Sequence, residues 1–288
     1  MFISIAIILL VIGSVAFHFL APSLGWWSTP IASNWGTIDD TIDLTFIITG
    51  FVFIALNLFM AWAVFKYRHR EDQKTEQKAA YEPENKKLEW WLTIFTTIGV
   101  VAMLAPGLSV WNDYVTVPDD AKVVEAVGQQ WQWTFRFPGN DGILGIADTK
   151  LITSDNPFGV NPKDPRGLDD VLIEDNELHL PIGGPIKMAL RSKDVLHDFY
   201  VPQFRAKMDL VPGLITYFWF TPTKVGTYEI LCAELCGVGH YTMRGTVVVE
   251  EDAEFQTWLS NQPTFGETLA ETQGTSVVAE INTAEAQE

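Results

Sequence analysis

Cysteine and basic residues are scarce in this chain of 288 residues. The two cysteines, Cys232 and Cys236, are too few for a disulfide-rich secreted scaffold or for a four-cysteine zinc or iron–sulfur site. The chain has 19 lysine and arginine residues against 36 acidic ones, a formal net charge of −17. We therefore expect no nucleic acid partner, because phosphate groups repel carboxylates. No glycine-rich phosphate-binding loop follows a predicted strand, so no nucleotide site is indicated.

Charged residues are absent from two long stretches in the first 111 residues. Residues 44–65 and residues 90–111 are each 22 residues long without a charge. As helices they would span about 33 Å, enough for a bilayer core of about 30 Å. Tryptophans stand near the ends of these runs, as is typical of the aromatic belts of membrane proteins. The sequence therefore predicts a transmembrane helix hairpin over residues 42–111, in preference to a pair of buried helices in a soluble protein.

The basic residues predict the orientation of this hairpin. Residues 66–88, between the two apolar runs, hold seven of the nineteen lysines and arginines. The positive-inside rule places this loop in the cytoplasm and everything after residue 111 outside. A further apolar run, residues 2–20, lies in a first segment of residues 1–41. It lacks the positively charged start of a signal peptide, which favours a retained third helix, with a cleaved signal as the alternative.

Beyond residue 111 the pattern changes to short alternating runs. Apolar and polar residues alternate from 131 to 137, which is typical of a half-buried strand, and several similar runs bounded by Pro or Gly follow. Residues 112–258 are thus expected to form an extracytoplasmic all-β sandwich or barrel. Residues 139–175, rich in Asp, Pro, Gly and Asn, are interpreted as a long surface loop. Residues 259–288 have few large apolar side chains and are interpreted as an acidic, disordered tail.

One stretch of twelve residues gathers metal-binding side chains. Cys232, Cys236, His240 and Met243 supply two thiols, an imidazole and a thioether, and His197 supplies a second imidazole. This soft donor set selects copper over magnesium or calcium, and the second thiolate would allow two copper ions to be bridged by both sulfurs. Three alternatives remain: a disulfide, which an extracytoplasmic location permits, a zinc site, for which methionine is a poor ligand, or unrelated core residues.

The stretch from 232 to 243 resembles the dinuclear copper A motif of cytochrome c oxidase subunit II, and the resemblance extends over about residues 42–250. It includes the helix hairpin, Gly-Gln-Gln-Trp-Gln-Trp at 128–133, Val-Leu-His at 195–197 and Lys-Met-Asp-Leu-Val-Pro-Gly at 207–213. The resemblance implies a cupredoxin-like copper domain. Leu214, Asp198 and Phe199 depart from the family, which often has Arg, Ser and Trp there, but none of them is a copper donor.

The resemblance also implies roles for individual residues. The copper ligands would be His197, Cys232, Cys236, His240, Met243 and the backbone carbonyl of Glu234. The Glu234 side chain would help to bind a magnesium or manganese ion shared with subunit I. Trp131 would receive electrons from cytochrome c, or else be a core residue of its strand. Glu89 would stand at the mouth of a proton pathway, or else be an end-charge of its helix. Asp194 would belong to the cytochrome-docking face.

The function that follows from the resemblance is electron transfer in respiration. The chain would accept electrons from cytochrome c at the copper centre and relay them to haem in subunit I, for reduction of oxygen to water coupled to proton translocation. Subunit III and the lipid bilayer are further expected partners, and the location is the bacterial cytoplasmic membrane with the copper domain on the periplasmic side. From residue 112 onward the chain has 27 acidic and 12 basic residues, a net charge of −15 that would attract a basic cytochrome c.

Three other classes of protein are weighed against this one. A quinol oxidase subunit of the same architecture would lack the copper ligands. Nitrous oxide reductase has a similar ligand string, but it is a larger, soluble enzyme. A membrane-bound copper-delivery or thiol-redox protein would bind one copper ion or cycle a disulfide, and it would not need Trp131 or Glu89.

Overall fold

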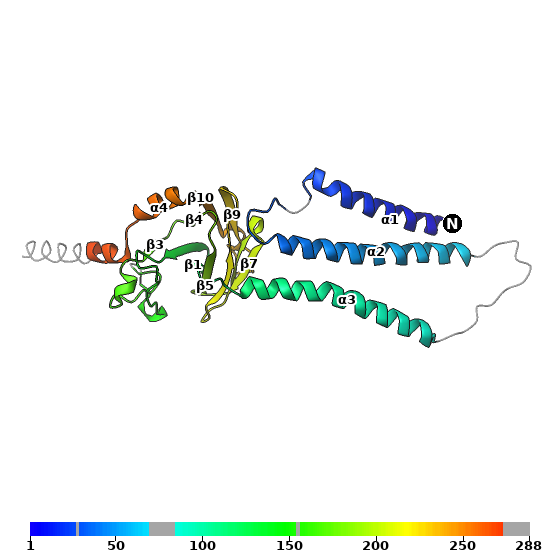
Figure 1. Ribbon diagram of the computed structural model, residues 1–288, viewed down its shortest axis with the longest axis horizontal. Helices are drawn as coiled ribbons and strands as arrows, with labels where there is room; N and C mark the ends of the chain where they lie inside the picture. The colour runs from blue at the N-terminus through cyan, green and yellow to red at the C-terminus, as the bar shows by residue number, and fades with distance from the viewer. Residues whose placement is uncertain (27–28, 69–83, 154–155, 273–288) are drawn as a thin grey trace, which may run out of the picture. The chain divides into compact units, whose positions relative to one another are not determined.

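The computed structural model describes residues 1–26, 29–68, 84–153 and 156–272. The chain divides into two compact units (Figure 1). The helical unit comprises Met1–Thr29 and Thr37–Trp111, and the β domain comprises Pro30–Gly36 and Asn112–Glu288. Most of the predicted cytoplasmic loop lies outside the described residues, as does the end of the predicted tail.

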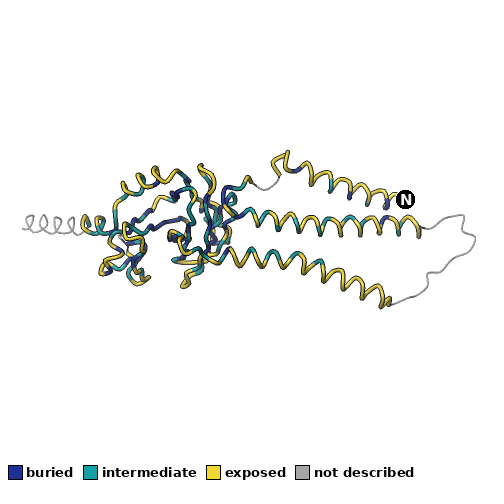
Figure 2. Tube along the Cα trace, in the orientation of Figure 1, coloured by how far each residue is buried: buried dark blue, intermediate teal, exposed yellow. Residues whose placement is uncertain are grey.

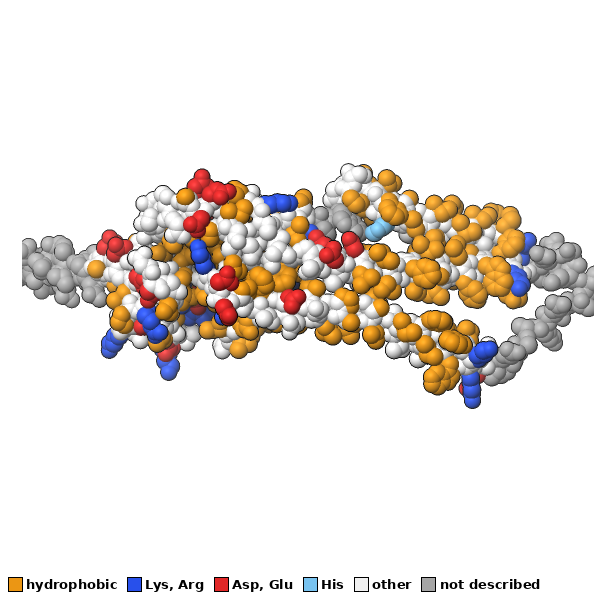
Figure 3. Space-filling view, viewed as in Figure 1, with side chains coloured by type: hydrophobic (Ala, Val, Ile, Leu, Met, Phe, Trp, Pro, Cys, Tyr) orange, Lys and Arg blue, Asp and Glu red, His pale blue; other side chains and the backbone are white. Residues whose placement is uncertain are grey.

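The helical unit contains three helices that are long and apolar enough to cross a membrane. They are α1 (Phe2–Leu20, extended by the short η1, Ala21–Leu24), α2 (Gly36–Lys66) and α3 (Lys86–Val115). Most of their side chains are exposed within this chain, and hydrophobic side chains cover them (Figures 2 and 3). Because the chain does not cover these apolar surfaces itself, they are suited to contact with lipid or with other membrane helices. The predicted hairpin is thus present as α2 and α3.

The β domain is a sandwich of two five-stranded sheets. Their strand orders are β3-β2-β1-β5-β8 and β4-β10-β9-β6-β7, and β1–β5 and β10–β4 are the parallel pairs. The strands are β1 (Lys122–Gln129), β2 (Gln132–Phe137), β3 (Val171–Ile173), β4 (Glu177–Pro181), β5 (Ile186–Ser192), β6 (His197–Val201), β7 (Ala206–Leu210), β8 (Thr216–Phe220), β9 (Gly226–Cys232) and β10 (Arg244–Glu250). The helical elements are η2 (Thr149–Leu151), η3 (Pro165–Gly167), η4 (Pro202–Phe204), η5 (His240–Thr242) and α4 (Asp252–Ser260). The expected fold class, membrane-length helices followed by a cupredoxin-like β-sandwich, is confirmed.

Strand β2 is buried on both faces, whereas the alternating pattern predicted a half-buried strand. Trp133 and Phe135 are fully buried, but so is Thr134, and Arg136 is 3% exposed. The Arg136 guanidinium bonds the carboxylates of Glu125 at 2.7 Å and Asp170 at 2.8 Å. Paired charges can be buried in this way because each satisfies the other.

The excursion from 139 to 175, interpreted as a surface loop, is exposed along much of its described length, but a few of its side chains reach the core. Phe158 and Val160 are fully buried and form a cluster with Val127 of β1 and Phe265. Asp170 also lies in this excursion and anchors it to β2 through Arg136. The polar composition of the segment concealed these few apolar anchors.

The tail was expected to be disordered from residue 259, and this is wrong up to residue 272. Thr264 forms a β-bridge with Val171, and the Phe265 amide donates to the carbonyl of Asp170 at 2.8 Å. Phe265 is fully buried. One large aromatic side chain therefore fixes a segment whose composition is otherwise typical of disorder. Residues 273–288 lie outside the described part of the chain.

A short piece of the predicted first segment belongs to the β domain. Ser33 bridges Pro222, and the indole of Trp35 donates to the carbonyl of Trp219 at 2.8 Å. Trp35 is 4% exposed and contacts the ring of Trp219 edge-on. The boundary expected at residue 41 therefore misses a contact that one buried tryptophan makes with the sandwich.

Candidate metal centre

Two neighbouring strands and one loop bring the predicted donors together. His197 begins β6 and Cys232 ends β9, and these strands are paired, with Phe199 opposite Cys232. The pairing of β6 with β9 therefore brings together a histidine and a cysteine that are 35 residues apart in the sequence. The amide of Cys232 donates to the carbonyl of Met243 at 3.2 Å, which closes the loop that joins β9 to β10.

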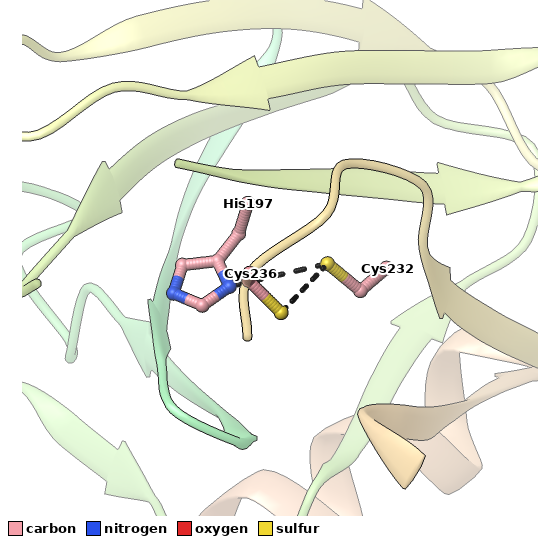
Figure 4. A group of neighbouring side chains, drawn as sticks. All are labelled: His197, Cys232 and Cys236. Atoms are coloured by element: carbon pink, nitrogen blue, oxygen red, sulfur yellow. Dashed lines mark hydrogen bonds between the residues drawn. The ribbon is translucent and has the colours of Figure 1, made fainter. Parts of the chain in front are cut away.

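The sulfur and nitrogen atoms lie within a few ångströms of one another (Figure 4). Cys232 Sγ is 3.7 Å from Cys236 Sγ and 3.9 Å from His197 Nδ1. Cys236 Sγ is 3.5 Å from His240 Nδ1 and 3.8 Å from Met243 Sδ. Five of the side chains named from the sequence therefore form one cluster, and His197, Cys236 and Met243 are almost fully buried in it.

The two thiols are free and close, but they are not bonded. Their separation of 3.7 Å is well beyond the S–S bond length of about 2.05 Å, so the structure does not hold the disulfide considered above. Burial raises the pKa of the Cys232 thiol, but hydrogen bonding to His197 and to backbone groups outweighs it, and the net pKa is lowered. Burial and the neighbouring Cys232 raise the pKa of Cys236. A metal ion that binds both sulfurs would therefore have to displace a proton from Cys236.

The donor set fits copper. Two thiolates, two imidazoles and a thioether are soft or borderline ligands, whereas magnesium and calcium prefer oxygen. The backbone carbonyl of Glu234 also reaches the cluster, since it accepts from Cys232 Sγ at 3.3 Å. The Glu234 side chain is half-buried. All six groups that the sequence pointed to are thus together at one end of the sandwich.

Asp194 lies behind His197, one of the predicted metal donors. Its Oδ1 is 2.8 Å from His197 Nε2 and also accepts from the Val195 amide, and its Oδ2 accepts from the Gln130 amide at 2.7 Å. Burial raises the pKa of this carboxyl, but the three N–H donors outweigh burial and the net pKa is lowered. With Nε2 engaged, Nδ1 of His197 is left to face the sulfurs, as in carboxylate–histidine–metal arrangements.

The Gly-Gln-Gln-Trp-Gln-Trp segment wraps this centre. A Cβ on Gly128 would lie 3.1 Å from the His197 ring, so a glycine at this position allows the backbone of β1 to lie close to that ring. Gln130 Nε2 and Trp131 Nε1 both donate to the carbonyl of Cys236, at 2.8 and 3.2 Å. Trp133 is buried edge-on against His197, with ring centroids 6.4 Å apart. Sequence reasoning noticed the motif but assigned no role to Gly128 or Gln130.

Trp131 is not a core residue, and that alternative is wrong. It lies in the turn between β1 and β2, and 37% of it is exposed. The rest of the indole covers the loop of residues 233–243, which holds Cys236, His240 and Met243 and is called the cysteine loop below, since a Cβ on Gly239 would lie 2.4 Å from Trp131 Cδ2. Glu89 belongs to the helical unit, where it is exposed in the first turn of α3.

Asp198, where the family often has serine, is a buried carboxylate beside the metal centre. Its Oδ2 accepts from Lys207 Nζ at 2.7 Å, and Asp209 stands opposite it on β7. Burial, and hydrogen bonding to Asp209, raise its pKa to about 7 although Lys207 opposes the shift. Lys207 thus compensates the charge that this departure introduces.

A β-sandwich that carries a thiol–imidazole–thioether cluster suited to copper, in a chain with three membrane-length helices, defines the class of membrane-anchored proteins with a candidate copper site. A family profile described as "Cytochrome C oxidase subunit II, periplasmic domain" matches residues 122–251. The chain is 59% identical over 265 residues to the alternative cytochrome c oxidase subunit 2 of Bradyrhizobium diazoefficiens, covering 92% of this chain and 93% of that protein. The chain therefore belongs to the cytochrome c oxidase subunit II family, whose members are subunits of an oxidoreductase complex.

Two further relatives are more distant. The cytochrome c oxidase subunit 2 of Thermostichus vulcanus is 36% identical over 136 residues, which is 47% of this chain and 32% of that protein. The periplasmic domain of subunit II of cytochrome oxidase (CoxB) of Bradyrhizobium japonicum is 30% identical, covers 50% of this chain and 95% of that domain, and has a TM-score of 0.38. As a family member with three membrane-length helices, the chain is a membrane protein with a periplasmic domain.

Proposed function

We propose that this chain is the electron-accepting subunit of a cytochrome c oxidase. It takes electrons from cytochrome c at a dinuclear copper centre and relays them to haem in subunit I, where oxygen is reduced to water with coupled proton translocation. The observation that carries the proposal is the pair of free thiols 3.7 Å apart, with two imidazoles and a thioether in contact. The proposed ligands are His197, Cys232, Cys236, His240, Met243 and the carbonyl of Glu234.

The protein holds these donors in fixed positions. His197 begins β6, which is paired on both sides in its sheet, Asp194 orients its ring, and Cys236 and Met243 are 2% and 1% exposed. Copper bound there supplies a one-electron relay. Donors that barely move suit a relay, because little rearrangement then accompanies each electron.

Trp131 is proposed as the point where electrons enter. Part of its indole is exposed to a docking protein, and its N–H bonds the carbonyl of Cys236, a proposed ligand. An electron that enters at the Trp131 indole would thus reach the Cys236 sulfur through one hydrogen bond and the atoms of Cys236 alone. The net charge of −15 from residue 112 onward favours a basic cytochrome c as the donor.

The remaining assignments concern partners and location. The carboxylate of Glu234 is proposed to share a magnesium or manganese ion with subunit I, and Glu89 to stand at the start of a proton pathway. The exposed apolar helices suit packing against subunit I, and subunit III completes the complex. The basic residues between α2 and α3 support a multi-pass arrangement in a bacterial cytoplasmic membrane, with that loop inside.

Copper analysis with electron paramagnetic resonance of the purified oxidase tests the function. We expect a pair of copper ions in this chain that share one unpaired electron. Cys236→Ser should abolish the mixed-valence signal, and Met188→Leu, a conservative substitution in β5 of the opposite sheet, should leave it intact. A single copper ion, or no copper with a disulfide, would instead favour a copper-delivery or thiol-redox protein.

A further inference from the structure

The turn between β1 and β2 is bonded to both halves of the metal centre. On one side, the backbone N–H of Gln130 donates to Asp194 Oδ2 at 2.7 Å, and Asp194 Oδ1 holds the ring of His197. On the other side, the amide of the Gln130 side chain donates to the carbonyl of Cys236 at 2.8 Å. One glutamine therefore joins the histidine side of the cluster to the cysteine loop.

The carbonyl of Cys236 accepts from two side chains. A carbonyl oxygen has two lone pairs, so it can accept from Gln130 Nε2 and from Trp131 Nε1 together. The bond from Gln130 is the shorter, 2.8 Å against 3.2 Å for the indole. Gln130 thus fixes the oxygen to which the indole N–H must be aligned.

The glycines of the loop show how closely the indole is seated. A Cβ on Gly239 would lie 2.4 Å from Trp131 Cδ2 and 2.6 Å from Cε3. A Cβ on Gly237 would lie 2.9 Å from Gln130 Nε2 and 3.2 Å from Trp131 Cζ2. The loop is therefore shaped to receive both side chains, and the amide and the indole lie side by side on it.

We propose that Gln130 is a positioning residue for electron uptake, which holds the Cys236 carbonyl and the β1–β2 turn so that the Trp131 indole stays on the cysteine loop. Gln130 itself is exposed, so its side chain contributes no core packing and its bonds serve the turn. The inference rests on the proposed role of Trp131 in electron uptake, and it adds a residue that neither donates to copper nor carries the electron.

The first test measures the seating of the indole without using activity. In the purified oxidase, Gln130→Met removes the donor while it keeps the length of the side chain. Hydroxyl-radical oxidation of Trp131, read by mass spectrometry, should rise about two- to tenfold, the effect of losing one hydrogen bond. Gln130→Glu, which also lacks the donor, should raise the oxidation of Trp131 in the same way. Gln132→Met on the neighbouring strand β2 should leave the oxidation of Trp131 unchanged. Unchanged oxidation of Trp131 in both Gln130 variants would overturn the inference.

The second test asks whether Gln130 acts through Trp131. At saturating reduced cytochrome c, Gln130→Met should slow the first electron transfer by at least about twofold, with KM and the copper resonance unchanged. In a Trp131→Phe background the same change should have no further effect, since coupled residues are not additive. Additive losses, a raised KM alone or a lost copper signal would each overturn the inference. If Trp131→Phe does not slow electron uptake, the proposed role of Trp131 fails, and the oxidation experiment still decides the positioning.

Discussion

Nε2 of His197 lies 2.8 Å from Oδ1 of Asp194. The same carboxylate accepts from the backbone amides of Val195 and Gln130, so all three of these hydrogen bonds are made within the chain. The family resemblance implied a docking role for Asp194, and 31% of its side chain is exposed. The geometry supports a different main role, since a carboxylate behind a ligating imidazole fixes both its tautomer and its orientation.

Replacing Asp194 should weaken copper binding. Asp194→Ala leaves the His197 ring free to turn and its Nε2 without a partner, and we expect copper affinity to fall about 10- to 100-fold. Copper that remains in the purified oxidase after dialysis against a graded chelator measures this. Asp120→Ala removes one exposed charge elsewhere in the domain and serves as the control. Equal copper retention in the two variants would refute the role of Asp194 in orienting His197 and leave only the docking role.

Gly239→Ala should push the indole of Trp131 off the loop. The backbone at Gly239 has φ of −93°, which alanine adopts freely, so the obstacle is the Cβ, 2.4 Å from the indole. We expect faster oxidation of Trp131 and a free energy of unfolding lowered by about 1–3 kcal/mol, the usual cost of overpacking. Urea unfolding of the detergent-purified chain gives the second quantity.

Gly184→Ala is the matched control for that substitution. A Cβ on Gly184 meets nothing within 4 Å, so stability should be unchanged or raised by up to about 1 kcal/mol. If Gly239→Ala were as stable as this control and left Trp131 as protected as in the native chain, the close packing of indole and loop would be refuted.

The candidate metal-binding cluster could be predicted because its chemistry depends on which residue types are present. Two cysteines, two histidines and a methionine form a distinctive set, and the strand pairing that brings His197 to Cys232 follows from the sandwich itself. Gln130 could not be assigned in this way. Its role depends on the direction of one amide toward a backbone carbonyl 106 residues away, and no residue pattern specifies that.

The buried anchors of the 139–175 excursion and of residues 259–272 could not be predicted, for a related reason. Composition averages over a window, whereas anchoring depends on single side chains such as Phe158 and Phe265, both fully buried. Likewise, an arginine in an alternating strand predicts a solvent-facing position, unless carboxylates from elsewhere reach it. Arg136 is buried because Asp170 arrives from the excursion, a contact between residues 34 positions apart.

Helix α4 packs on Phe137 of β2 through Phe255 and Trp258, and a stack of Trp258 on His179 should add to this attachment. The Trp258 indole lies over the His179 ring, with centroids 4.1 Å apart and planes at 11°. Glu250 and Glu177 fix the ring plane, each at 2.8 Å from a ring nitrogen. A double-mutant cycle with His179→Ala and Trp258→Ala should give a coupling energy of about 0.5–1.5 kcal/mol in urea unfolding. The cycle of His179→Ala with Gln256→Ala, on the exposed side of α4, should give none, and equal couplings in both cycles would refute the stack.

Asp170 should make stability depend on pH. Its burial raises its pKa to about 6, although Arg136 and the Gly145 amide pull the other way. A carboxyl whose pKa is higher in the folded than in the unfolded state favours folding while it is protonated, below about pH 4. That contribution is lost as the pH rises through 6. Asp170→Asn keeps an acceptor for Arg136 and cannot ionise, so its stability relative to the native chain should rise between pH 4 and 7, by on the order of 2 kcal/mol. Thermal unfolding of the detergent-purified chain across this range measures the difference, and Asp120→Asn should show no such trend. A difference between Asp170→Asn and the native chain that stays constant with pH would show that Asp170 is ionised throughout.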